Sequence, residues 1–155
     1  FARNYSRSLL DGLEDEDWFW SPDQFTTHIA WQVGHLAMSE YGLTLFRQRG
    51  RDLSVDQQLM TSKFRKLFMR GTRPIADRSA YPEPAEILAV LDRVHARMRI
   101  EIVGFDGPEL DEPLEPPHAA YATRYGALLF AGDHEMIHSG HIGMLRRLMG
   151  KDPIR

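Results

Sequence analysis

The sequence contains no cysteine, which excludes disulfide bonds, thiolate metal ligands and a cysteine nucleophile. It also lacks a block of basic residues. With a formal net charge of −3, we expect neither nucleic acid nor an anionic membrane surface as a partner. No apolar run approaches the roughly 20 residues that a membrane-crossing helix needs. These absences are compatible with a cytoplasmic protein, which is our expectation.

The composition that remains is that of an ordinary globular domain. The chain has 155 residues, of which 43% are hydrophobic and 26% are charged. This length is sufficient for one substantial core. No internal repeat or low-complexity segment divides the chain, so we expect a single domain over residues 1–155.

Hydrophobic periodicity predicts an all-α chain. We expect helices over about residues 3–13, 26–49, 84–104 and 124–149. A short amphipathic helix over 54–69 is expected in the connector 51–81, whose basic side chains make it a candidate lid for an anionic substrate. The helix 26–49 is apolar nearly all round, so it should lie at the centre of a bundle or under a second subunit. Residues 105–121 are expected to form a loop long enough to cross from one end of a bundle to the other.

Two histidines in the last expected helix indicate a metal site. His134 and His138 are spaced i, i+4, so their rings project to one side, on a stripe that also contains Ile137 and Leu148 and should be buried. A buried imidazole needs a partner for its ring nitrogens. This spacing allows two nitrogens to bind one divalent metal at about 2.0–2.1 Å. The alternative is a pair of core histidines bonded to backbone or water, and we favour the metal.

A third ligand is expected from the second helix. His35 lies on its apolar surface and is the leading candidate. His28, two turns earlier, is not expected to bind, and His95 is expected at the rim of the core. His118, in the expected loop, is a candidate for substrate contact.

Two further residues of the last helix are candidates for catalysis. His134-Glu135-x-x-His138 also matches the HExxH pattern of zinc peptidases, in which Glu135 would be the general base. However, only 17 residues follow His138, no sheet edge is expected to hold a peptide, and Glu135 lies about 100° around the helix from His134. His141 shares the face of the histidine pair but lies further along the helix, so we expect it beside the metal or facing the substrate rather than as a fourth ligand.

Two motifs together resemble the DinB-like (YfiT-type) superfamily. They are Trp31-Gln32-Val33-Gly34-His35-Leu36-Ala37 on the second expected helix and His134-x-x-x-His138-x-Gly140 on the last. The resemblance covers the whole chain in helix order. It implies a four-helix bundle whose second and fourth helices supply three histidines to a divalent metal, often zinc or nickel, and it implies frequent dimerisation. Where this chain has His141, the family often has glutamine.

The resulting prediction is an all-α four-helix bundle with a long crossover and a short extra helix in a connector, forming a homodimer. Its metal, zinc or nickel, would act as a Lewis acid that lowers the pKa of water or of a thiol. Two chemistries stay open: hydrolysis, and transfer or isomerisation with a low-molecular-weight thiol, as in characterised relatives. Small molecules are the expected substrates. The alternative function is a non-catalytic metal- or small-ligand-binding bundle related to stress, and a zinc peptidase ranks below both.

Overall fold

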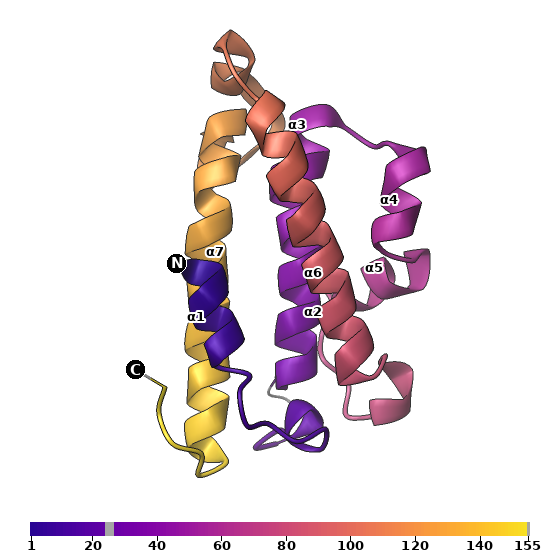
Figure 1. The fold of residues 1–155 in the computed structure, drawn as a ribbon, viewed down its shortest axis with the longest axis vertical. Coiled ribbons are helices and arrows are strands. Elements are labelled where there is room, and N and C mark those ends of the chain that lie inside the picture. The colour runs from indigo at the N-terminus through magenta and orange to yellow at the C-terminus, as the bar shows by residue number, and fades with distance from the viewer. Residues whose placement is uncertain (24–26, 155) are drawn as a thin grey trace.

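Four helices form the bundle in the computed structural model, which describes residues 1–23 and 27–154. They are α1 (Ala2–Ser8), α2 (Ile29–Glu40), α6 (Pro84–Glu101) and α7 (Arg124–Leu148). α2 packs against both α6 and α7, and α1 lies along α7 (Figure 1). The predicted all-α bundle is confirmed. The first helix ends five residues before the predicted boundary at residue 13, and a turn with Gly12 at φ 70° follows.

The second helix runs without a break to the predicted stop. α2 continues through a π-helical segment, Tyr41–Phe46, into α3 (Arg47–Arg49), and Gly50 ends the helix with φ 77°. Its first turn is capped by His28, whose Nδ1 accepts a hydrogen bond from the backbone N–H of Trp31 at 3.1 Å. The predicted start at residue 26 lies outside the described residues.

The apolar surface of this helix is covered within the chain. Ile29, Ala30, Val33 and Ala37 are almost completely buried, and α2 packs against α5 as well as α6 and α7. Of the two predicted positions for this helix, the structure shows the one at the centre of the bundle, and the homodimer stays a prediction. The large apolar side chains that remain exposed on α7 are the alternative surface: Tyr125, Leu129, Met136, Ile137, Met144 and Leu148.

The connector holds two short helices where one was predicted. α4 (Leu53–Leu59) ends at the extended residue Met60, and Thr61 then caps α5 (Ser62–Phe68) by accepting a hydrogen bond from the N–H of Phe64. α4 contacts α6, whereas α5 packs against α2. Single 3-10 turns occur elsewhere, at Asp17–Phe19, Arg78–Ala80, Ile102–Gly104 and Pro108–Asp111.

The crossover contains a β-hairpin that the sequence analysis missed. β1 (Pro113–His118) pairs antiparallel with β2 (Tyr121–Thr123) immediately before α7. Three prolines in β1 conceal the strand, because proline is tolerated only where a backbone donor is not needed. The hairpin is anchored by a small apolar cluster that joins it to α7 and to the π-helical segment: Leu43, Leu114, Tyr121 and Ala127.

The buried face of α7 is rotated from the predicted stripe. Ile137 and Leu148, predicted to be buried, are 53% and 55% exposed. Glu135, Ser139 and Ile142 are buried instead, because α1 packs along α7. None of the helices in the described part of the chain is both long and apolar enough to cross a membrane.

Candidate metal centre

Three histidines from two helices meet between α2 and α7. His35, His134 and His138 each offer one ring nitrogen, and these nitrogens lie within 4.8 Å of one another. The Nε2 atoms of His134 and His138 are 3.3 Å apart. His35 and His138 are buried and His134 is half-buried. The structure thus brings together the three residues that the sequence singled out as metal ligands, and we call them the histidine centre.

The ring of His35 is held in place by α5. Its Nδ1 lies 2.7 Å from the backbone oxygen of Phe68, which can only accept a hydrogen bond, so Nδ1 carries the proton and Nε2 keeps its lone pair. That lone pair accepts a hydrogen bond from Ser39 Oγ at 3.1 Å, a contact that a bound metal would replace. Gly34 makes this contact possible, because a Cβ at that position would overlap the ring of Phe68. The glycine therefore allows α5 to approach α2 closely enough for its last carbonyl to reach His35.

The ring of His138 is oriented by Gln32. The Nε2 group of Gln32 donates to Thr27 Oγ1 at 2.9 Å, and its Oε1 faces Nδ1 of His138 within hydrogen-bond distance. His138 therefore donates through Nδ1 and keeps the Nε2 lone pair. Metal-binding histidines usually donate their second ring nitrogen in this way. Sequence reasoning assigned no role to Gln32, although it stands three residues before His35 on the same helix.

The imidazoles are held neutral, which is the form that binds metals. The pKa of His138 is lowered to about 3, mainly by burial and in addition by the neighbouring His134 and His35. Burial is also the main cause that lowers the pKa of His134 to about 4, and it lowers the pKa of His35. Nitrogen lone pairs gathered at this separation suit a divalent cation, so the side chains present fit the expected metal.

The carboxylate of Glu135 belongs to a different group, on the side of α7 that faces α1. Arg3 Nε donates to Glu135 Oε1 at 2.7 Å, and Ser6 Oγ donates to the same oxygen. Arg3 Nη2 bonds Glu40 Oε2 at 2.7 Å, and Glu40 Oε1 lies 2.7 Å from Nδ1 of His95. We call Arg3, Glu40, His95 and Glu135 the charge cluster. Because both Glu135 oxygens face α1, the geometry does not support Glu135 as the general base of an HExxH site.

The other histidines lie where their local contacts place them. His141 is exposed, and its ring centroid is 5.7 Å from that of His138 with a 77° angle between the ring planes. His118 on β1 stacks on Tyr121 with centroids 4.4 Å apart. His28 is buried at the start of α2, and His95 is half-buried. None of these four joins the nitrogens of the histidine centre.

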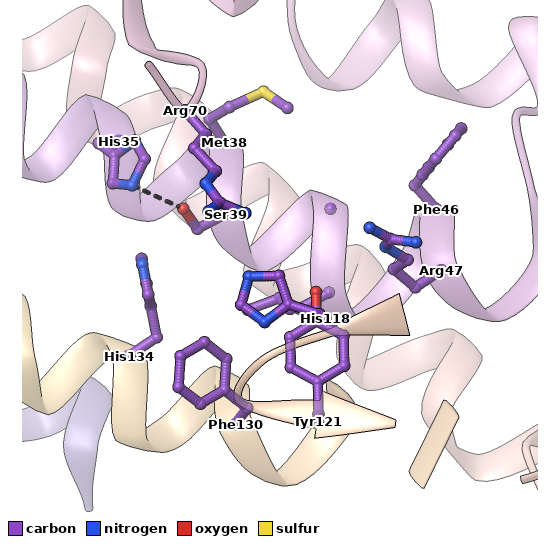
Figure 2. Close-up of a pocket in the computed structure, with 12 residues that line it drawn as sticks. His35, Met38, Ser39, Phe46, Arg47, Arg70, His118, Tyr121, Phe130 and His134 are labelled. Carbon is purple, nitrogen blue, oxygen red and sulfur yellow. Dashed lines mark hydrogen bonds between the residues drawn. The ribbon is translucent and has the colours of Figure 1, made fainter. Parts of the chain in front are cut away.

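A cavity of about 460 Å³ opens beside the histidine centre. Figure 2 shows His35 and His134 at one end and Arg47 at the other. The π-helical segment contributes to the wall, and such segments are frequent at functional sites. Sequence reasoning anticipated His118 and the basic connector here, but not the aromatic wall built by the hairpin and α7. The complete lining is His35, Met38, Ser39, Gly42, Leu43, Phe46, Arg47, Arg70, His118, Tyr121, Phe130 and His134.

Comparison with known proteins identifies one family. The model of the DinB superfamily matches residues 1–142. The matched region includes the histidine centre, Gln32 and every residue that lines the cavity. No curated protein matches the chain.

Proposed function

This chain belongs to the DinB superfamily, and we propose that it is a metal-dependent enzyme whose divalent cation is held by His35, His134 and His138. The observation that carries this proposal is the convergence of three neutral imidazoles, two of them with Nδ1 already engaged as a donor. Zinc and nickel are the metals we propose, because imidazole nitrogen suits both. Three protein ligands are also typical of catalytic zinc sites, which keep a position for water or substrate.

Each residue around the centre has a distinct task in this proposal. When bound, the metal supplies Lewis acidity that makes a coordinated water or thiol more acidic. Phe68 and Gln32 keep the rings of His35 and His138 oriented for binding. The cavity admits a small molecule beside His134, and its aromatic wall excludes water from the apolar part of that molecule. We propose hydrolysis, or transfer or isomerisation with a low-molecular-weight thiol, as the reaction.

The test combines metal analysis with substrate profiling. Metal-free protein is reloaded with zinc or nickel and assayed on a panel of esters and amides, and on electrophiles in the presence of a small thiol. We expect turnover by the loaded protein and not by the metal-free protein, and loss of most bound metal in His35→Ala. His95→Gln, outside the histidine centre, is the control and should keep its metal.

Two results would contradict the proposal. Stoichiometric metal in His35→Ala would remove α2 from the site. Tight binding of small molecules by the loaded protein without turnover on any substrate class would instead indicate a binding module.

A further inference from the structure

The cavity beside the histidine centre is positively charged although the chain as a whole is acidic. The sequence has 22 acidic and 19 basic residues, whereas the side chains that line the cavity include two arginines and no carboxylate. A divalent metal at the centre would add further positive charge. A concave site of one sign concentrates ligands of the opposite sign, so this cavity favours anions.

Arg47 is directed to the cavity while its neighbour is not. Arg49, two residues later, is fixed by Asp56 at 2.7 Å and by Glu101 at 2.6 Å. Arg47 is half-buried, lines the cavity and forms no ion pair with any residue that the structure describes. The helix thus separates a structural arginine from one whose guanidinium donors remain for a ligand.

Arg70 and His118 bring further donors to the same space. Arg70 follows α5 and, like Arg47, has no ion pair within the described part of the chain. Burial lowers the pKa of His118, and Arg70 and Arg47 lower it further, as expected for two guanidinium groups near this ring. The N–H of Ala120 donates to His118 Nδ1 at 3.1 Å, so the neutral ring carries its proton on Nε2 and acts as a donor there.

The rest of the lining suits an apolar body. Tyr121 and Phe130 have ring centroids 5.5 Å apart, and Phe130 continues the aromatic wall to His134 at 5.6 Å. Met38, Leu43 and Phe46 add apolar surface. The volume of about 460 Å³ lies in the range of small-molecule sites, roughly 300–1,000 Å³.

We propose that this cavity binds a small organic anion with an apolar or aromatic body, and that Arg47 and Arg70 recognise its anionic group. His118 donates a hydrogen bond to that group, and the aromatic wall holds the body of the ligand. The opposite end of the molecule then faces the histidine centre. This last statement deepens the proposed function and rests on it, whereas recognition of the anion by the arginines does not require a metal.

The experiment uses naphthalene-2-carboxylate as probe and its neutral amide as matched control. Binding to the metal-free protein is measured by calorimetry. We expect Arg47→Gln to weaken carboxylate binding about tenfold, because a charge-assisted hydrogen bond is lost. The more exposed Arg70→Gln should weaken it about threefold. Arg51→Gln and Arg73→Gln, which alter exposed arginines outside the cavity, should stay within about twofold.

The outcomes separate this inference from the proposed function. Equal affinity for the acid and the amide, or unchanged carboxylate binding in both cavity variants, would overturn the anion site whatever the metal content. Carboxylate binding that depends on Arg47 in a protein that takes up no metal would support the anion site while rejecting the metal-dependent enzyme. Replacing the probe with 2-naphthyl phosphate shows which anionic group the arginines prefer, and loss of affinity for it in Arg47→Gln supports the same site.

Discussion

Two largely buried polar groups share helices α2 and α7, the histidine centre and the charge cluster that also includes α1 and α6, and they differ in the partners of their polar atoms. In the charge cluster, all four carboxylate oxygens of Glu40 and Glu135 have partners within the chain, supplied by Arg3, Ser6 and His95. In the histidine centre, the outer nitrogens of His35 and His138 have protein acceptors, while the inner nitrogens face one another, with Ser39 Oγ 3.1 Å from Nε2 of His35 as their only other partner among the described residues. The carboxylates of the charge cluster are satisfied by the chain itself, although Nη1 of Arg3 is buried without a hydrogen-bond partner. Converging imidazole lone pairs, by contrast, favour a cation from outside.

The boundary between the two groups passes between adjacent residues of α7. His134 faces the histidine centre and Glu135 faces α1, so the HExxH pattern is divided between two environments. The two histidines of the motif therefore belong to the proposed metal centre, while the Glu135 carboxylate is bonded to Arg3 and Ser6.

Removing the His138 nitrogen that faces the other two histidines should abolish most metal binding. In His138→Ala we expect metal affinity to fall by more than about 100-fold, since losing an outer hydrogen bond alone typically costs about 10–100-fold. Helicity should be retained. Elemental analysis after dialysis, with circular dichroism on the same sample, measures both. A full complement of metal in this variant would show that the centre does not use His138.

Removing the carboxylate of Glu135 should instead lower the stability of the protein and leave its metal content unchanged. Glu135→Ala leaves Arg3 with Glu40 alone in a largely buried position, so we expect the free energy of unfolding to fall by about 2–3 kcal/mol. Metal content should stay at the wild-type level. Urea unfolding and elemental analysis provide the two values. If Glu135→Gln instead lost its activity without losing stability or metal, Glu135 would be a catalytic base and the division would fail.

An intermediate effect is expected from the group that orients His138. Gln32→Leu removes the acceptor for Nδ1, and we expect metal affinity to fall about tenfold. Thr27→Val, which removes only the partner of the Gln32 amide, should have a smaller effect in the same direction. Competition with a coloured chelator gives both affinities. Equal affinities in wild type and Gln32→Leu would mean that the ring needs no orienting partner.

The three histidines were easier to predict from the sequence than the residues that hold the site in place. The histidines follow from spacing within helices, whereas the contacts around them join residues far apart in the sequence. The pair His134 and His138 follows from helical spacing alone, and His35 from its place in a second helix. By contrast, Arg3 meets Glu135 across 132 residues, and Phe68 reaches His35 only because Gly34 leaves room. No local pattern encodes such contacts. Helix order was likewise predictable from periodicity, while the proline-rich hairpin lacked the alternation that indicates a strand.

Acid should destabilise the metal-free protein through the histidine centre. Burial lowers the pKa of His138 to about 3, against about 6.5 for an unfolded histidine, so below pH 6.5 the unfolded chain binds the extra proton. Stability is therefore complete above pH 6.5 and is lost as pH falls toward 3. Between pH 7 and 5.5 this one residue should lower the free energy of unfolding by about 1 kcal/mol. Urea unfolding of metal-free wild type and His138→Gln tests this, and an identical pH dependence in the two proteins would contradict it.

The smallest effect on metal is expected at His141. Its exposed ring stands next to His138 but outside the converging nitrogens, so it belongs to neither buried group. His141→Gln, which introduces the residue that the superfamily often has here, should keep metal affinity within about twofold of wild type, since no ligand nitrogen is removed. It should instead change turnover or small-molecule affinity. His95→Gln, a substitution of the same kind in the charge cluster, is the control. If His141→Gln lost metal as severely as His138→Ala, His141 would be a fourth ligand, and a centre closed by four protein ligands would be structural rather than catalytic.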